Sequence, residues 1–196
     1  SLWDPALKDS VVMMDDMRNV VGVTLKTLGQ SFNTTDPGIL AQAREKLLQL
    51  KPNIRALDYD TPHNLMISGE AAVGYMFTPQ VAWALAENPD LKVVYPQEGM
   101  GGFGIDAIVV PVNAPHKGNA HAFIDFLLRP EIGAQIAEVQ QYINCNQAAV
   151  PLLSEEYLNN PVVFIPSELL GETEFIQDVG DAVVIYNEMW TAFKQQ

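Results

Sequence analysis

The chain has 196 residues, of which 48% are hydrophobic, and its 24 acidic and 11 basic side chains give a formal net charge of −13. The length suits one compact domain or two small lobes, and the apolar content excludes a disordered acidic tail. The negative charge argues against nucleic acid as a partner, because affinity for the phosphate backbone comes from Lys and Arg.

Short apolar runs of β type alternate with longer helical patterns through the first half of the chain. Asp36 and Pro37 are typical of the N-cap and first position of a helix, whose apolar residues then repeat at helical spacing as Leu40, Ala43, Leu47 and Leu50. We expect strands at 10–14, 54–57, 71–77 and 91–95, and helices at 17–28, 37–51, 62–68 and 79–87. This alternation predicts an α/β fold with a largely parallel sheet.

A glycine-rich break at 98–104 precedes a further expected strand at 105–110. Its residues 99–104 match the dinucleotide-binding pattern G-x-G-x-x-G, but that pattern requires a helix directly after it. We therefore interpret the glycines as a crossover between lobes and expect no cofactor. Two helices follow at 120–128 and 131–141, the first with Phe123, Ile124 and Leu127 on one packed face, and a last helix places Tyr186, Trp190 and Phe193 in the core.

Two residue types that often carry chemistry are sparse here. The three histidines lack the spacing of a metal site, so no metal is expected. The single Cys145 has no second Cys or His beside it, which excludes an intramolecular disulfide and indicates a buried or inert thiol.

Two positions at strand ends are candidates for a site. Asp15-Asp16 follows the first expected strand, and Asp106 begins the strand at 105–110. Ligands of open α/β sheets bind beyond the carboxyl ends of strands. Asp16 is therefore a candidate ligand contact, although capping the following helix explains it equally well. A hydrolase that uses Asp16 and Asp106 as an acid/base pair is the alternative, and a plain interaction module with a solvated acidic face is a third.

Several segments resemble the spermidine/putrescine-binding proteins of bacterial ABC importers. They run in order along the whole chain: residues 15–20, 33–37, 51–56, 68–70, 96–99, 120–131 and 178–180. The resemblance implies the later part of a type II periplasmic-binding-protein fold, in which two α/β lobes close on a ligand. Residues 1–102 with 152–196 would form one lobe, and 103–151 would belong to the other, N-terminal lobe, most of which is missing.

The resemblance also implies a function without catalysis: an extracytoplasmic or periplasmic protein that delivers a polyamine to a membrane permease. Its ligand-binding residues would be Asp16, Asn19, Phe77, Phe103, Asp106 and Tyr142. Asn19 stands where many family members have Glu, Gly104 where an aromatic residue often stacks on the ligand, and Ile176 where a polar contact is frequent. These departures leave open which small organic cation is bound.

Overall fold

The computed structural model describes residues 1–98, 102–165 and 173–195, which fall into two compact units. The first unit is Ser1–Gly104 with Ser167–Gln196, and the second is Ile105–Pro166. The glycine-rich motif lies partly outside the described residues, since 99–101 are not among them.

A three-stranded parallel sheet forms the centre of the first unit. Its strands are β1 (Val11–Met13), β2 (Ile54–Leu57) and β3 (Val73–Tyr75), in the order β2-β1-β3. Met13 lies opposite both Leu57 and Tyr75, so the three strands end at the same level. Three of the predicted strands are thus confirmed, at shorter lengths.

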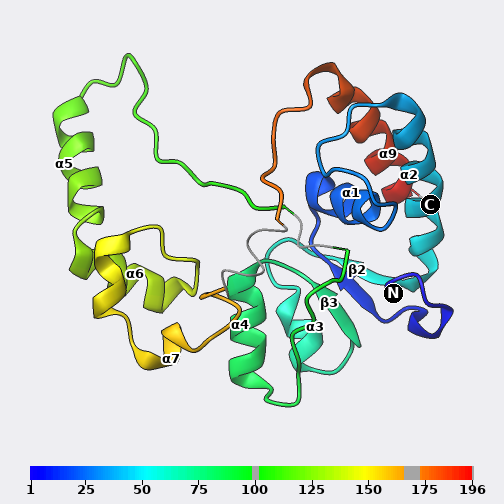
Figure 1. The fold of residues 1–196 in the computed structure, drawn as a ribbon, viewed down its shortest axis with the longest axis horizontal. Coiled ribbons are helices and arrows are strands. Elements are labelled where there is room, and N and C mark those ends of the chain that lie inside the picture. The colour runs from blue at the N-terminus through cyan, green and yellow to red at the C-terminus, as the bar shows by residue number, and fades with distance from the viewer. Residues whose placement is uncertain (99–101, 166–172, 196) are drawn as a thin grey trace. The chain divides into compact units, whose positions relative to one another are not determined.

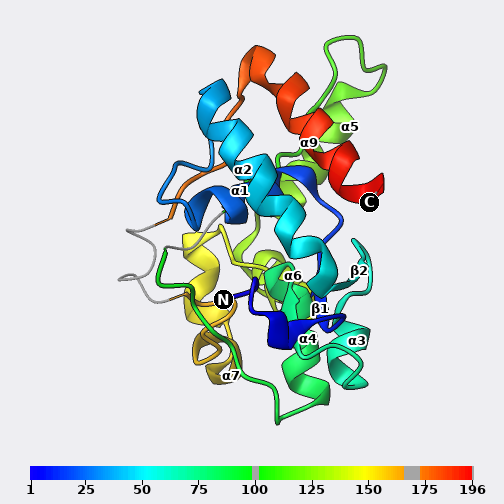
Figure 2. The ribbon, with the colours of Figure 1, turned by 90° about the vertical axis from the view of Figure 1, so that its right-hand side faces the viewer.

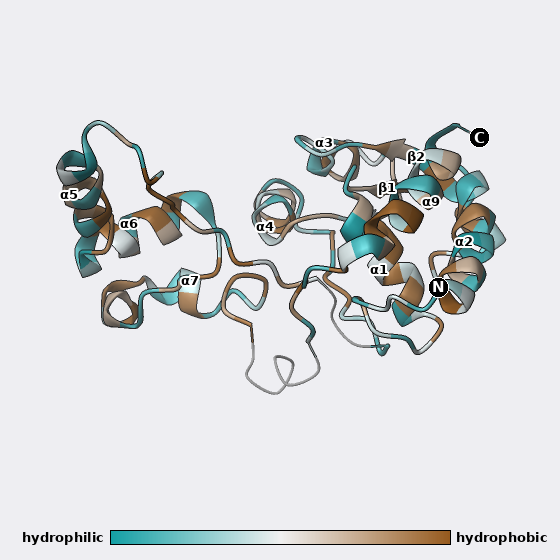
Figure 3. Cartoon of the chain, turned by 90° about the horizontal axis from the view of Figure 1, so that it is seen from above, coloured by the Kyte–Doolittle hydropathy of each residue, from teal (hydrophilic) through white to brown (hydrophobic). Residues whose placement is uncertain are grey.

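Three helices pack together to form much of the hydrophobic core of this unit, and Figures 1 and 2 both show them side by side. They are α1 (Met17–Lys26), α2 (Pro37–Leu50) and α9 (Val183–Gln195). The predicted apolar face of α2 is confirmed, since its four residues Leu40, Ala43, Leu47 and Leu50 are fully buried. From α9, Tyr186, Met189 and Phe193 pack into the same cluster. Much of α1 has the hydrophobic colour in Figure 3, as expected for a helix buried between neighbours.

Two short helices, α3 (His63–Ile67) and α4 (Thr78–Glu87), pack on each other beside β3. Short 3₁₀ turns complete the unit at Pro5–Leu7, Lys51–Asn53 and Gly180–Ala182. The predicted cap at Asp36 is confirmed, because its Oδ1 accepts hydrogen bonds from the backbone N–H groups of Gly38 and Ile39 at 2.7 and 2.9 Å.

The expected strands at 91–95 and 105–110 are wrong for the structure, which has no strand in either segment. A strand needs a neighbouring backbone to take its hydrogen bonds. Neither segment joins the β-ladder of the described strands, and several of their apolar side chains are in solvent: Val94 is 82% exposed, Ile105 78% and Val109 77%.

The second unit contains helices and no strand among its described residues. Its elements are α5 (Lys117–Leu127), α6 (Pro130–Gln140), the 3₁₀ turn Gln147–Leu152 and α7 (Glu155–Leu158). Both predicted helices are confirmed. No residue of α5 is fully buried and Phe123 is 59% exposed, whereas Ile124 and Leu127 are half-buried. α5 lies against α6, yet much of its apolar face remains in solvent.

Residues 153–165 lie within the second unit, and 173–195 belong to the first. Tyr157 is buried, and its hydroxyl accepts a hydrogen bond from the Asn144 N–H at 3.0 Å. Ser154 donates through its N–H and hydroxyl to the Glu138 carboxylate on α6, at 2.6 and 3.0 Å. That these units are two ligand-closing lobes stays a prediction.

Two further observations concern residues singled out in the sequence. Cys145 is exposed, so of the expected buried or inert thiol the buried alternative is wrong and the inert one stays a prediction. None of the helices within the described ranges has the length and apolar character needed to cross a membrane.

Candidate binding site at the carboxyl edge of the sheet

Asp16 lies three residues beyond β1 and begins α1. Its Oδ1 accepts two hydrogen bonds from Asn19, one from the backbone N–H and one from the side-chain Nδ2, both at 2.8 Å. The capping role considered for Asp16 is therefore confirmed. The other carboxylate oxygen, Oδ2, has no hydrogen-bond partner within the described residues and is available to a ligand.

Asn19 is buried and holds Asp16 in place. Its Oδ1 accepts a hydrogen bond from the Tyr75 hydroxyl at 3.4 Å. Burial and the nearby Asp16 carboxylate raise the pKa of the Tyr75 phenol, so it remains a protonated donor. A Cβ built on Gly102 would lie 2.3 Å from the Asn19 Oδ1, which shows that the Gly102 backbone covers this amide. Asn19 thus contacts Asp16, Tyr75 and Gly102.

The neighbouring Asp15 has a different partner. Both of its carboxylate oxygens accept from the Lys194 ammonium on α9, at 2.7 and 2.8 Å. The two adjacent aspartates therefore differ in availability, because Asp15 is paired with a cation and Asp16 is not.

Phe77 lies two residues beyond β3, at the start of α4. Its backbone N–H donates to the Gln80 Oε1 at 3.0 Å, which fixes the chain at the entrance to the helix. Its ring packs edge to face against Tyr59, with 5.3 Å between the centroids and 74° between the planes. The sheet edge therefore carries an aromatic pair as well as a carboxylate.

Phe103 is joined to a segment that is distant in sequence. It forms an isolated parallel bridge with Phe175, and the two rings pack at 6.2 Å and 65°. The Phe103 N–H donates to the Glu174 carbonyl at 3.2 Å, and the Ile176 N–H donates to the Phe103 carbonyl at 2.9 Å. Ile176 thus contributes backbone to this bridge, while a Cβ on Gly104 would meet only open space.

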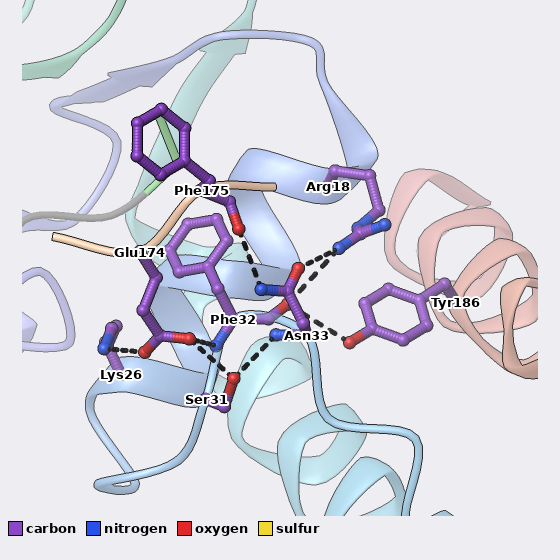
Figure 4. Close-up of polar contacts among 8 residues, drawn as sticks. All are labelled: Arg18, Lys26, Ser31, Phe32, Asn33, Glu174, Phe175 and Tyr186. Atoms are coloured by element: carbon purple, nitrogen blue, oxygen red, sulfur yellow. Dashed lines mark hydrogen bonds and ion pairs between the residues drawn. The ribbon is translucent and has the colours of Figure 1, made fainter. Parts of the chain in front are cut away.

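A polar network fixes the segment 174–177 to α1 and the loop that follows it (Figure 4). The Glu174 carboxylate pairs with the Lys26 ammonium and accepts from the Ser31 hydroxyl at 2.6 Å and the Phe32 N–H at 3.1 Å. Burial disfavours the charged carboxylate, but these hydrogen bonds outweigh it and hold the pKa of Glu174 below its ordinary value.

Asn33 completes this network from the same loop. Its Nδ2 donates to the Phe175 carbonyl at 2.9 Å, and its Oδ1 accepts from the Gln177 N–H and from the Arg18 guanidinium, each at 2.9 Å. The guanidinium also lies over the Tyr186 ring, 5.1 Å from its centroid. The segment that carries Phe175 is therefore anchored on the first unit by side chains of α1 and of the loop that follows it.

Asp106 and Tyr142 belong to the second unit and are not brought together with Asp16 by any described contact. Asp106 is exposed in the segment that forms no strand. Tyr142 is 46% exposed, and its carbonyl accepts a hydrogen bond from the buried Tyr157 hydroxyl. Of the six expected site residues, four therefore lie in the first unit and two lie in the second.

Sequence reasoning missed several residues of this region: Tyr59, Tyr75, Asn33, Glu174 and Phe175. Tyr59 and Tyr75 had an available signal, because both lie at the ends of strands. Asn33 lay in a segment that carries the resemblance but was given no role there, and no pattern marked Glu174 or Phe175, which meet its loop over more than 140 residues of chain. Among the described residues, no three His, Cys, Asp or Glu side chains are grouped so as to hold a metal ion.

A parallel sheet with a carboxylate and aromatic rings at its carboxyl edge is the arrangement of a ligand-binding α/β protein. The chain belongs to the family of bacterial extracellular solute-binding proteins, whose sequence profile matches residues 1–164.

Individual relatives are more specific. The chain is 38% identical, over 98% of its length, to the spermidine/putrescine-binding periplasmic protein of Salmonella typhimurium, and 37% identical to the protein of the same name from Escherichia coli. It spans about 55% of the length of each.

Solved structures show the same fold. A chain from Listeria monocytogenes superposes with a TM-score of 0.90 at 34% identity, over 98% of this chain and 60% of that one. The spermidine/putrescine ABC transporter substrate-binding protein of Streptococcus pneumoniae gives 0.81 at 31% identity, over 99% and 60%. The expected α/β fold of the periplasmic-binding-protein type is confirmed. None of these relatives supports the hydrolase alternative.

Proposed function

We propose that the full-length protein binds a polyamine such as putrescine or spermidine, with Asp16 accepting one ammonium group. The observation that carries this proposal is the Asp16 carboxylate, which is fixed by Asn19 through one oxygen and has its other oxygen available. An anion held in this way needs no rearrangement to receive a cation, so little ordering cost opposes binding.

The aromatic residues complete the chemistry that an alkyl amine requires. Methylene groups placed against Phe77 and Phe103 would contribute about 0.8 kcal/mol per buried CH₂, and an ammonium over a ring face about 0.5–2 kcal/mol. Asp106 and Tyr142 would be further ligand contacts, as the resemblance implies. Asn19 serves this site by positioning Asp16, since it is buried beneath Gly102.

The biological setting follows from the relatives and is part of the same proposal. The protein would act outside the cytoplasm, in the periplasm, since its relatives are named as periplasmic proteins. It would deliver the amine to the permease of an ABC importer. It would not be an enzyme. The portion of the relatives that this chain does not span would supply the other side of the ligand cleft.

Isothermal titration of the full-length protein with putrescine and spermidine tests the proposal. Asp16→Asn is the informative variant, because Asn also caps helices and leaves the start of α1 intact. Losing one charge-assisted hydrogen bond of about 1.5–3 kcal/mol predicts an affinity about 10- to 150-fold weaker.

Asp15→Asn is the matched control, since it removes the same charge from the adjacent residue, whose partner is Lys194. Its affinity should stay within about threefold of the unmodified protein, as expected for a charge already paired. The proposal is wrong if the unmodified protein binds no amine, or if Asp16→Asn binds as tightly as Asp15→Asn.

A further inference from the structure

The rings of Tyr59 and Phe77 converge across the end of the central strand. β2 and β3 lie on opposite sides of β1, so their backbones are about 10 Å apart, twice the spacing of neighbouring strands. Tyr59 and Phe77 each lie two residues beyond the positions that face Met13, yet their ring centroids are only 5.3 Å apart. Both side chains must therefore lean toward each other beyond the carboxyl end of β1, the strand that leads into Asp16.

Gln80 holds the two loops together. Its buried side chain donates from Nε2 to the Tyr59 carbonyl at 2.8 Å and to the Asp60 carbonyl at 3.2 Å. Its Oε1 accepts from the Phe77 N–H at 3.0 Å. One amide thus fixes the backbone of both aromatic residues, so the spacing of their rings is set by the fold.

The turn that carries Tyr59 is also fixed and negatively charged. Asp58 accepts from the Asp60 N–H at 2.9 Å and from the Thr61 N–H and hydroxyl, each at 3.0 Å. Hydrogen bonds from the Thr61 backbone outweigh burial and lower the pKa of Asp58, which keeps this carboxylate ionised beside the aromatic pair.

Tyr59 itself is open to a ligand. The residue is 52% exposed, and its hydroxyl makes no hydrogen bond to any described residue. Buried tyrosines of the same chain use theirs: the Tyr186 hydroxyl donates to the Thr34 carbonyl at 2.9 Å. Two rings at 74° present their faces on two sides of a corner, and an aromatic face attracts cations.

We propose that Tyr59 is a further ligand-contact residue, which forms with Phe77 an aromatic corner for an alkylammonium group of the bound amine. This inference rests on the proposed function, because it assigns the corner to the same ligand that Asp16 binds. The corner holds the ammonium or the methylenes next to it against the two ring faces.

Titration of full-length variants with spermidine and putrescine tests this contact. Tyr59→Leu keeps a side chain of apolar bulk but removes the ring, and should weaken spermidine binding about two- to fivefold, the effect of one exposed cation–π contact. Tyr59→Phe keeps the ring and should stay within about twofold of the unmodified protein, since a hydroxyl exposed to water contributes little net affinity.

The matched control is Trp83→Leu. Trp83 is also a partly exposed aromatic residue in an edge-to-face pair of the same unit, with His63 at 5.5 Å and 66°. Its affinity for both amines should equal that of the unmodified protein.

An absorption measurement distinguishes direct contact between Tyr59 and the amine from a role in which Tyr59 only positions the Phe77 ring. The tyrosine difference spectrum of the unmodified protein minus Tyr59→Phe should change with amine and saturate at the same concentration as the heat of binding. If the unmodified protein binds but this spectrum does not change, or if Tyr59→Leu binds as tightly as Trp83→Leu, the corner is wrong while the proposed function stands. If the unmodified protein binds no amine, the proposed function itself is wrong.

Discussion

The two units of this chain differ in how much of their apolar sequence they bury. In the first, three parallel strands and the helices α1, α2 and α9 enclose a cluster whose members are almost all fully buried. In the second, apolar residues of equal size remain in solvent, among them Val109, Phe123 and Val139, at 77%, 59% and 72% exposure. The difference teaches that apolar patterning identifies residues suited to packing against another segment. Whether they are buried depends on that segment being present.

The largest test of this contrast compares one buried and one exposed side chain. Leu47→Ala removes a fully buried residue from the α2 face and should destabilise the first unit by about 3 kcal/mol, through lost transfer energy and the remaining cavity. Phe123→Ala, in α5, should change the stability of the 196-residue chain by less than about 0.5 kcal/mol, as surface substitutions do. Urea denaturation followed by circular dichroism measures both.

The same Phe123→Ala substitution then sharpens the comparison in the full-length protein. If a segment outside this chain covers α5, the substitution should cost more there than in the 196-residue chain. Equal effects in both proteins, or a small effect of Leu47→Ala, would contradict the contrast between the units.

A second test uses two glycines at the end of the first unit. Gly102 has a φ of +75°, and a Cβ there would lie 2.3 Å from the Asn19 Oδ1, so Gly102→Ala should cost about 1–3 kcal/mol of stability. Gly104→Ala is the matched control, because nothing lies within 4 Å of its Cβ and its φ is not positive. Differential scanning calorimetry should show a lower midpoint for the first variant alone; equal midpoints would mean that Gly102 does not pack on Asn19.

The smallest effect concerns Glu174 and its dependence on pH. Glu174→Gln removes the ion pair with Lys26 and should cost about 1 kcal/mol at pH 7, the upper range for a partly exposed ion pair. The pKa of Glu174 is lower in the folded protein than its ordinary value of 4.5, so on acidification the unfolded chain takes up the proton first. The contribution of the charge is therefore complete above pH 4.5 and is lost as pH falls through the lower, folded pKa.

Urea denaturation of Glu174→Gln and the unmodified protein between pH 7 and pH 3 measures this loss. The difference in stability between them should shrink only below pH 4.5. A difference that stays constant down to pH 3 would show that the carboxylate contributes through its shape and not through its charge.

Local patterns predicted the elements whose partners are near or whose apolar repeats are strong. The Asp36-Pro37 start and the apolar repeat of Leu40 and Leu47 predicted α2 almost residue for residue, because caps and helical periodicity act within one helix. The segments 91–95 and 105–110 have equally strong β-type composition, yet form no strand. Composition reports a fit to a pleated surface, whereas a strand also requires the neighbouring backbone.

The residues of the site also differ in whether local sequence could predict them. Asp16 could be located from its position just after a strand, as the topology of parallel sheets dictates, whereas Phe77 was located only by the resemblance to the spermidine/putrescine-binding proteins. The burial of Asn19 could not be predicted, because it follows from the close approach of Gly102, more than eighty residues away in sequence. The contact of Glu174 with Ser31 and Phe32 is of the same kind, and no short motif records it.

The position of α9 in the chain also determines when the first unit can fold. Tyr186, Met189 and Phe193 fill the core formed with α2, but they are synthesised about 130 residues after it. At a translation rate of about 5–20 residues per second, the inner face of α2 waits on the order of ten seconds for its cover. During that interval the growing chain presents Leu40 and Leu47 to whatever binds apolar surface, so the time taken by translation itself sets how long this half-formed core needs protection.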